Sequence, residues 1–570
     1  MRAQAFMVPA AVSALFLSSS RGLQRLRIGV LCEGPMVPRY VRGVLDDLLR
    51  ADYISLALAI NIRYPVASHK RFNESLGMRL LSTPVEAYYR QGGDPLEAVP
   101  CADLLEGVPR AMISGLLENG RIAISEVDAL AVRAASLDVL INFCAWPFTV
   151  MKEALARHGV WYFHFGDSRR YPDGSGFIRE LVDRDPLTGI ELLQQMGPTE
   201  EPMVLMRALF GTSPFPSRYV NRFAPVWGAR HFVVQKLWEL RESGILRALS
   251  KPIDGAPTIS SSRSPGTGAA LRWLAIEAMK RLFSVKRLGR EPSKWRVGVR
   301  RSTQALFEEP AAQALKTFNW LNAPPGHYWA DPVLCEVAGQ TWLFFEHMIE
   351  SDGIAQISCG RLQADGNLVE VRTVLRRPHH LSYPQIIQSD GEIFMLPEAA
   401  QSGGLDLYRA RRFPDDWVLE ARLLDFRCVD SAIFKSGDIW CMVTSPQLVT
   451  GHAPITWLLR ANDLTGPWKY CLNGIVANSA SVARGAGGVF EHKGRLIRPS
   501  QDCGRTYGEA LLFNKIESII PEDYSESVFH RVDGSGLALL AGVHSYSRVN
   551  DWECIDGRFQ TRAAPWSYFT

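Results

Sequence analysis

The second half of the chain repeats one pattern four times, and this repeat restricts the fold more than any other feature of the sequence. In each copy an apolar strand runs into a glycine-containing turn and a second apolar strand, which predicts a β-hairpin. The copies span residues 331–346, 383–398, 430–445 and 486–501, so their starts lie roughly 50 residues apart. A repeat of that length with several strands per unit is typical of a β-propeller. A fifth blade is expected from residues 537–557 and the strands before them, which predicts a five-bladed β-propeller over residues 295–570.

The first half of the chain alternates strands with helices. Residues 26–34 (LRIGVLCEG) have the pattern of a buried strand that ends in glycine, and residues 37–51 follow with apolar side chains on one helical face. Residues 127–135 and 137–148 repeat the alternation as helix and strand. Strand, glycine turn and helix form the unit of an α/β fold, so we expect a Rossmann-type domain over residues 26–245 of a multidomain protein.

Residues 246–294 separate the two predicted domains. Within them, residues 250–268 are rich in serine, proline and glycine and lack periodicity, which indicates a linker. Residues 269–288 then have the pattern of a basic amphipathic helix. A helix that packs between domains and a helix that contacts a membrane surface both fit this pattern.

Residues 1–25 form an N-terminal extension. Residues 5–17 are apolar and follow Arg2, which is the layout of a signal peptide, but Pro9 interrupts them and no A-x-A cleavage site follows. We expect a disordered or mis-started N-terminus on a cytoplasmic protein, with a signal peptide as the alternative.

Composition excludes several classes of function. The chain has no run of about 18 apolar residues, which argues against a transmembrane span. A net charge of +4 is small for 570 residues and does not indicate a nucleic-acid partner. The 10 cysteines include no CxxC pair and no Cys/His cluster, so we expect reduced thiols and no metal site.

One histidine stands between aromatic residues at the end of a predicted strand. The stretch WYFHFGD contains Tyr162, His164 and Asp167, and a polar loop with two glycines follows it. A histidine satisfied within a core is the simpler interpretation of such a residue. The alternative is a histidine that holds and polarises a substrate.

The run from Leu137 to Leu205 resembles the catalytic core of folate-dependent formyltransferases. That family has Asn-x-His at a strand end, then a polar loop, a Thr-Gly strand and a loop with an aspartate. His164 falls on the family histidine, Thr188-Gly189 on the Thr-Gly pair and Glu200 near the aspartate. The resemblance implies a 10-formyltetrahydrofolate-like donor, with His164 and Glu200 managing the proton and Asp167 among the substrate-binding residues.

Tyr162 stands where the family has its asparagine. In that family the asparagine amide holds the formyl oxygen as negative charge develops, and one such donor stabilises a transition state by about 3 kcal/mol. A tyrosine hydroxyl can donate a hydrogen bond, but it places the donor elsewhere. Three hypotheses therefore stay open for this domain: transfer of a one-carbon or acyl group with altered geometry, binding of a related ligand, and a scaffold.

The second half contains short strings that are similar to one family. They include YWADP (328–332), LYRARRFPDDW (407–417), VDSAIF (429–434) and RLIRPSQDCGRTYGEAL (495–511). The family is the N-terminal domain of plant glucosamine inositolphosphorylceramide transferases and its bacterial relatives, which is akin to five-bladed propeller glycosidases. The resemblance extends over roughly residues 295–565 and implies a carbohydrate substrate.

Acidic residues mark the starts and ends of the repeated hairpins. Asp331 and Asp430 open the innermost strands of two blades, so we expect them within about 10 Å of each other at one mouth of the channel, and Glu398, which closes the second hairpin, is a further catalytic candidate. Glycosidic chemistry needs such a pair, one acid and one base or nucleophile. Further substrate-binding candidates are Trp329, Tyr383, Arg484, Arg498, Asp502 and Tyr507. Plain carbohydrate binding and aspartates that merely cap turns are the alternatives.

Two sugar-linked domains in one chain predict an enzyme of glycoconjugate or envelope-polysaccharide biosynthesis. We expect a group transferase whose first domain acts on a sugar, nucleotide sugar or glycolipid that the propeller recognises. In a second hypothesis the propeller is itself the glycosyltransferase or glycoside hydrolase. In a third the chain is a non-catalytic carbohydrate-binding protein.

Overall fold

The protein divides into two compact units. Residues 1–280 and 448–450 form the first unit, and residues 281–447 and 451–570 form the second. The computed structural model describes residues 10–22, 24–63, 93–118, 121–144, 153–197, 201–214, 217–249, 294–449, 453–520 and 523–560. The predicted linker and the predicted amphipathic helix lie outside the described residues. Among the residues that the structure describes, no helix is long and apolar enough to cross a membrane.

The first unit is built on one eight-stranded sheet with the strand order β10-β9-β8-β7-β1-β3-β5-β6. The strands from β8 through β7, β1 and β3 to β5 run parallel, whereas β9, β10 and β6 pair in antiparallel fashion. The strands are β1 (Leu26–Cys32), β3 (Ile54–Arg63), β5 (Arg110–Glu118), β6 (Arg121–Ile124), β7 (Val139–Asn142), β8 (Val160–His164), β9 (Leu187–Gln195) and β10 (Met203–Gly211). A short pair, β2 (Met36–Pro38) and β4 (Ala98–Pro100), stands apart from this sheet.

Helices connect these strands, as the α/β alternation predicts. They are α2 (Arg39–Arg50), α4 (Glu126–Ala134), α5 (Arg179–Asp183), α6 (Arg218–Gly228) and α7 (Phe232–Ser243). On α2 the apolar side chains fall on one face, where Val41, Val44 and Leu45 are buried. Parallel strands need such crossover connections, and burial of one helical face stabilises them on the sheet.

The described part of the N-terminal extension, residues 10–22, is an ordered part of the first unit and not the disordered tail that the sequence predicts. It contains the short helices α1 (Ala10–Ser13) and η1 (Ala14–Phe16). Phe16 is fully buried, and its carbonyl accepts a hydrogen bond from the Tyr53 hydroxyl at 2.8 Å. The Glu242 carboxylate on α7 accepts bonds from Ser19 and Ser20. The segment stays folded because these groups satisfy its polar backbone while Phe16 is buried.

The second unit contains five four-stranded antiparallel sheets, which are the five blades of a β-propeller. The first blade has β13 (His327–Val337), β14 (Gln340–Ile349), β15 (Ala355–Leu362) and β16 (Leu368–Leu375), and the second has β17 (Ser382–Ser389), β18 (Glu392–Glu398), β19 (Leu405–Arg412) and β20 (Asp416–Leu424). The third has β21 (Cys428–Ser436), β22 (Ile439–Pro446), β23 (Thr456–Ala461) and β24 (Lys469–Ala477), and the fourth has β25 (Phe490–His492), β26 (Arg495–Asp502), β27 (Ala510–Ile520) and β28 (Asp523–Asp533).

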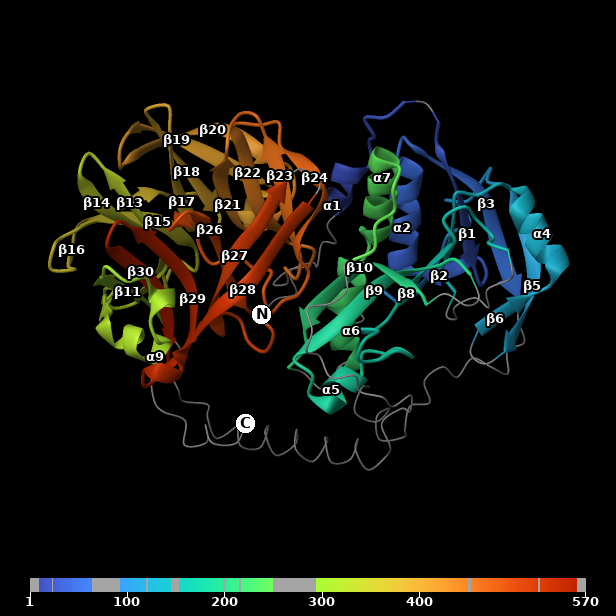
Figure 1. The fold of residues 1–570 in the computed structure, drawn as a ribbon, viewed down its shortest axis with the longest axis horizontal. Coiled ribbons are helices and arrows are strands. Elements are labelled where there is room, and N and C mark those ends of the chain that lie inside the picture. Colours follow the sequence, from blue (N-terminus) through green and yellow to red (C-terminus); the bar gives the residue numbers. More distant parts are fainter. Residues whose placement is uncertain are drawn as a thin grey trace. The chain divides into compact units, whose positions relative to one another are not determined.

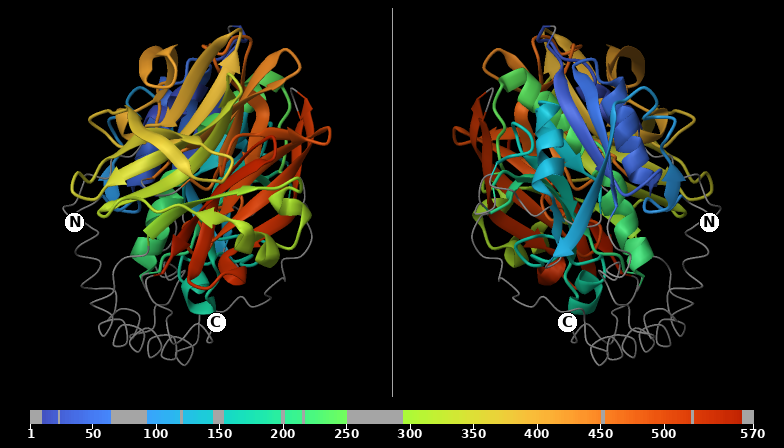
Figure 2. Two further views of the ribbon diagram at one scale, coloured as in Figure 1. Left: turned by 90° about the vertical axis from the view of Figure 1, so that its left-hand side faces the viewer. Right: turned by 90° about the vertical axis from the view of Figure 1, so that its right-hand side faces the viewer.

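The fifth blade joins the two ends of the propeller. Its strand order is β12-β11-β30-β29, with β11 (Lys294–Arg301) and β12 (Asn319–Trp320) from the start of the unit and β29 (Leu540–Val549) and β30 (Trp552–Phe559) from its end. Figures 1 and 2 show the yellow-green β11 beside the red β30. Residues 537–557 thus supply two strands of this blade as predicted, and the preceding strands that complete it come from the start of the unit. Pairing the first strands with the last closes the ring and leaves no open edge at the seam.

Candidate functional site

Three blades place one residue each at a matching kink of their first strand. Asp331 in β13, Tyr383 in β17 and Asp430 in β21 each lie where the pairing register with the next strand shifts. Their φ angles are 47°, 48° and 49°, in the left-handed region that residues other than glycine seldom adopt. Such bulges re-aim a side chain, and strain of this kind concentrates at functional sites. The repeated kink therefore marks a candidate site.

Asp430 and Glu398 lie together in a buried carboxyl cluster. The Asp430 backbone N–H donates to Glu398 Oε2 at 3.1 Å, and Arg484 Nε lies 2.6 Å from Asp430 Oδ2. Burial raises the pKa of both carboxyl groups, and the Arg484 charge acts in the opposite direction. Asp331 contributes to the increase at each of them, so the three acids that the sequence singles out influence one another electrostatically.

A fourth acid and a histidine extend the cluster. Glu346 Oε1, from β14, lies 3.3 Å from His380 Nε2, just before β17. Burial raises the pKa of Glu346. Burial opposes the charged form of His380, but the hydrogen bond and charge of Glu346 outweigh it, so the pKa of His380 is raised. His380 thus lies at ion-pair distance from Glu346, whereas among the described residues Glu398 has no cation at that distance.

Tyr383 and two glycines hold Arg484 in place. The Gly487 N–H donates to the Tyr383 hydroxyl at 2.5 Å. A Cβ added to Gly485 would lie 2.7 Å from the Asp430 carbonyl oxygen, so only glycine allows this close approach. Arg484 in turn covers the Tyr507 ring at 4.8 Å from its centroid. Tyr383 is 2% exposed, so it positions this segment and does not stack on a sugar as predicted.

Asp331, His544 and Asp556 offer three buried ligand atoms that all lie within 4.8 Å of one another. Within this group Asp556 accepts hydrogen bonds at both oxygens, from the Asp331 N–H at 2.9 Å and from the His544 ring at 2.6 Å. The group is therefore a hydrogen-bonded set, and we assign no metal to it.

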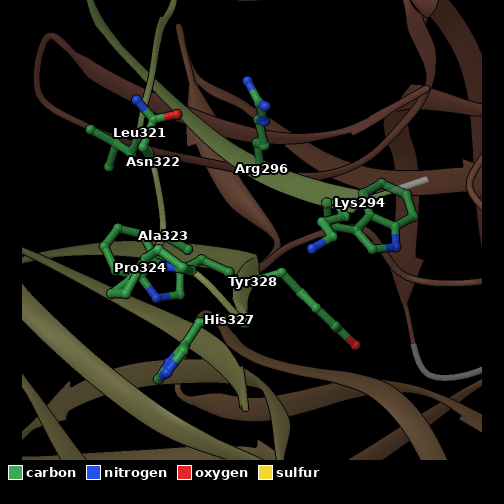
Figure 3. Close-up of a pocket in the computed structure, with 12 residues that line it drawn as sticks. Lys294, Arg296, Leu321, Asn322, Ala323, Pro324, His327 and Tyr328 are labelled. Carbon is green, nitrogen blue, oxygen red and sulfur yellow. The ribbon is translucent and has the colours of Figure 1, made fainter. Parts of the chain in front are cut away.

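A pocket of about 150 Å³ adjoins the cluster. It lies between β11, the 321–326 loop and the start of β13, with Lys294 on one side and Ala323 and Pro324 on the other (Figure 3). Two of its lining residues also face the cluster. Trp295 stacks on the His544 ring at 3.8 Å, and the pKa of Tyr328 is raised by burial and by the charges of Glu346 and Asp331. The aromatic pocket and the carboxyl cluster are therefore neighbours that share the contacts of Trp295 and Tyr328.

Three predicted substrate-binding residues have other roles. Arg498 is 1% exposed; its guanidinium binds Glu526 and the carbonyls of Val482 and Ala483. Trp329 packs in an apolar cluster against Phe345 and also lines the pocket. Asp502 pairs with Arg531 at 2.5 Å. The Arg498 and Asp502 side chains are thus occupied within the fold, whereas Tyr507 is 43% exposed and available to a ligand.

In the first unit, the predicted histidine is buried at the end of β8. Its Nε2 lies 2.9 Å from the Tyr171 carbonyl oxygen, and Tyr162 precedes it by two positions on the same strand. A Cβ on Gly189 would lie 2.5 Å from the Asp167 nitrogen, so the Thr-Gly pair lets β9 approach the loop after His164. Glu200 lies outside the described residues, and its predicted approach to His164 stays a prediction.

Charged side chains that sequence reasoning missed form ion pairs at the loop after β8. Asp167 binds Arg169 at 2.6 Å and lies 3.8 Å from Arg207, which in turn binds Glu191 at 2.5 Å. Glu191 is the residue opposite His164 in the β8–β9 pairing. Asp167, predicted to bind substrate, is therefore part of a buried ion network.

In the propeller, sequence reasoning missed Glu346, His380, His544 and Asp556. Each is a polar residue within or beside an apolar strand segment, such as Asp556 in ECIDG. That interruption is a weak signal, because a polar residue at such a position also occurs on any half-exposed strand.

Comparison with known proteins gives a match to the second unit. Residues 315–534 match the family described as "Glucosamine inositolphosphorylceramide transferase 1, N-terminal". The transferase of that name from Oryza sativa subsp. indica is 34% identical over 208 residues, which cover 35% of this chain and 28% of the relative. The one from Arabidopsis thaliana is 33% identical over 207 residues, 35% of this chain and 27% of the relative. The match thus spans less than a third of each relative's length.

Solved structures of glycosidases are similar at low identity. A β-xylosidase, RS223, aligns with a TM-score of 0.32 and 11% identity over 42% of this chain and 94% of its own. An exo-1,5-α-L-arabinanase from a bovine ruminal metagenomic library aligns with a TM-score of 0.29 and 14% identity over 38% and 87%. The five-bladed architecture rests on the strand pairing described above. Over residues 315–534, the propeller is similar to the N-terminal part of the glucosamine inositolphosphorylceramide transferases.

Proposed function

We propose that this protein is a transferase of glycoconjugate biosynthesis and that its propeller binds the sugar. The observation that carries the proposal is the convergence of Asp331, Glu398 and Asp430 from separate blades beside an exposed aromatic ring, Tyr507. Aromatic faces bind sugar rings, and paired carboxyl groups in different protonation states serve bond exchange at an anomeric carbon. The names of the relatives support a glycolipid acceptor of the inositolphosphorylceramide type.

Two carboxyl groups of the cluster have different roles in the proposed transfer, one as the acid and one as the base. Burial raises the pKa of Glu398, which has no cation at ion-pair distance among the described residues, so we assign it the role of the acid. In a transfer it would protonate the leaving oxygen as the glycosidic C–O bond breaks. Asp331 would take the proton of the acceptor hydroxyl as the new C–O bond forms. Asp430 lies beside them, with its Oδ2 at 2.6 Å from Arg484 Nε.

A turnover and binding assay tests this proposal. We expect the purified protein to bind glycolipid head groups by saturation-transfer NMR and to transfer sugar from a nucleotide or nitrophenyl glycoside. Binding without turnover from any donor would make the propeller a recognition domain. If the protein neither binds the head groups nor transfers sugar, the proposed carbohydrate function is wrong.

A second function, one-carbon transfer by the first unit, is favoured by the contact between the Gly189 strand and the loop after His164. If it holds, titration calorimetry with a stable folate analogue should detect binding. Tyr162→Asn should then preserve or raise formyl transfer, because it restores an amide donor. If Tyr162 instead fills the donor pocket, the wild type should not bind and Tyr162→Ala should. No binding by the wild type or either variant would contradict a folate site.

A further inference from the structure

His544 and Asp556 lie on adjacent strands of the fifth blade, next to Asp331. His544 Nδ1 lies 2.6 Å from Asp556 Oδ1, and His544 Nε2 lies 3.7 Å from Asp331 Oδ1. All three side chains are buried. The three groups therefore form a carboxylate–imidazole–carboxylate series that ends on an acid of the candidate site.

Asp556 accepts hydrogen bonds from its neighbours at both carboxylate oxygens. Its Oδ1 also accepts the Ser545 backbone N–H at 3.0 Å, and its Oδ2 accepts the Asp331 backbone N–H at 2.9 Å. The second bond holds the kinked backbone of Asp331 in its left-handed conformation. The Ser545 hydroxyl donates to Asp331 Oδ1 at 2.7 Å and orients the carboxylate.

The His544 ring is held on several sides. Trp295 stacks on it with ring planes 13° apart, and Tyr507 meets it edge-on at 5.4 Å. Because Asp556 accepts from Nδ1, the ring has one orientation, with Nε2 toward Asp331. A ring fixed in this way cannot turn its charge away from Asp331.

The charged groups that face His544 come from three places: Asp331 on β13, Asp556 on β30 and Arg484 before β25. Burial opposes the charged form of the imidazole, and so does Arg484. The two aspartates outweigh both, Asp556 most strongly, and raise the pKa of His544. The imidazolium is therefore present below this raised pKa and lost above it, and while present it supplies Asp331 with a cation.

We propose that Asp556 and His544 are positioning residues that keep Asp331 an oriented carboxylate at acidic pH, where a buried acid without a cation takes up a proton. The proposal rests on the function proposed above for Asp331 as the base. Neither residue is needed to touch the substrate. Their effect reaches the reaction through the charge and direction of the Asp331 side chain.

The pH profile of sugar turnover tests the pair in the full-length protein. Asp556→Asn removes the charge that favours the imidazolium, so the acidic limb should move to higher pH, by about one unit or more for the loss of a nearby opposite charge. His544→Gln, which cannot be charged, should move the limb in the same direction. A limb that stays in place in both folded variants would overturn the proposal.

Glu553→Gln is the matched control. Glu553 is a buried carboxylate on the same strand as Asp556, but it binds Arg300 and Arg548 instead of the cluster. Its loss should lower stability and leave the acidic limb in place. A limb that moves equally in this variant would show a general effect of destabilisation and contradict the positioning role.

NMR separates this proposal from the proposed function. The His544 ring nitrogens and the Asp331 ¹³Cγ, assigned with His544→Gln and Asp331→Asn, can be titrated without any sugar. We expect the pKa of His544 to lie above that of an ordinary histidine and to fall in Asp556→Asn, and we expect the Asp331 ¹³Cγ signal to follow the charge of His544. If these NMR results are obtained but the protein does not turn over sugar, the positioning role of His544 and Asp556 is retained and the proposed transferase function is rejected. A His544 titration that is the same in Asp556→Asn, or an Asp331 signal that does not follow the His544 charge, would reject the pair.

Discussion

Arg498→Met should destabilise the propeller by about 3–5 kcal/mol, the cost of leaving one partner of a buried ion pair alone. The Arg498 guanidinium makes two bonds to Glu526, at 2.8 and 2.5 Å, and one to the Val482 carbonyl at 3.0 Å. Methionine fills a similar volume but satisfies none of these acceptors. The Glu526 carboxylate would then keep only the Tyr524 hydroxyl, at 2.7 Å. Urea unfolding followed by tryptophan fluorescence measures the loss.

Arg495→Met is the matched control, because Arg495 is an exposed residue on the same strand, β26. This control should change the free energy of unfolding by less than about 0.5 kcal/mol. If Arg498→Met left stability intact and abolished sugar binding, Arg498 would be a substrate ligand, as its place in the sequence predicts. Equal losses in both variants would contradict the buried-pair explanation.

Asp331→Asn should lower the rate of sugar transfer by about 10²–10⁴-fold, the usual contribution of a positioned general base. The amide matches the carboxylate in size and can keep the kinked backbone and the hydrogen bond from Ser545. It cannot accept a proton from the acceptor hydroxyl. Initial rates with a saturating donor, together with a thermal melt, distinguish lost chemistry from lost folding.

Glu370→Gln serves as the control for the Asp331 variant, because Glu370 makes a half-exposed ion pair with Arg361 on an outer strand. Such pairs contribute about 0–1 kcal/mol, so both stability and rate should stay near the wild-type values. A rate for Asp331→Asn within a few fold of the wild type would remove Asp331 from the chemistry. The cluster would then have a binding role only.

The sequence by itself determined the repeated hairpins and the matching positions of two acids within the repeat. Strand periodicity, turn glycines and the spacing between copies are local properties, and they are written in residues 331–346 and in the later copies. Asp331 and Asp430 begin equivalent strands, so the repeat alone places them at equivalent points of a ring. The α/β alternation of the first half could be predicted in the same way, from strands such as Leu26–Cys32.

Only the tertiary structure decided which polar residues share the site and which are structural. Asp331 and Asp556 are 225 positions apart, and they meet because β11 closes the ring against β30. No local pattern contains that pairing. Arg484 and Arg498 look alike in sequence, but one pairs with Asp430 in the cluster and the other with Glu526 inside a blade. The physical reason is that burial and charge partners depend on contacts between distant strands, whereas periodicity depends on neighbouring residues alone.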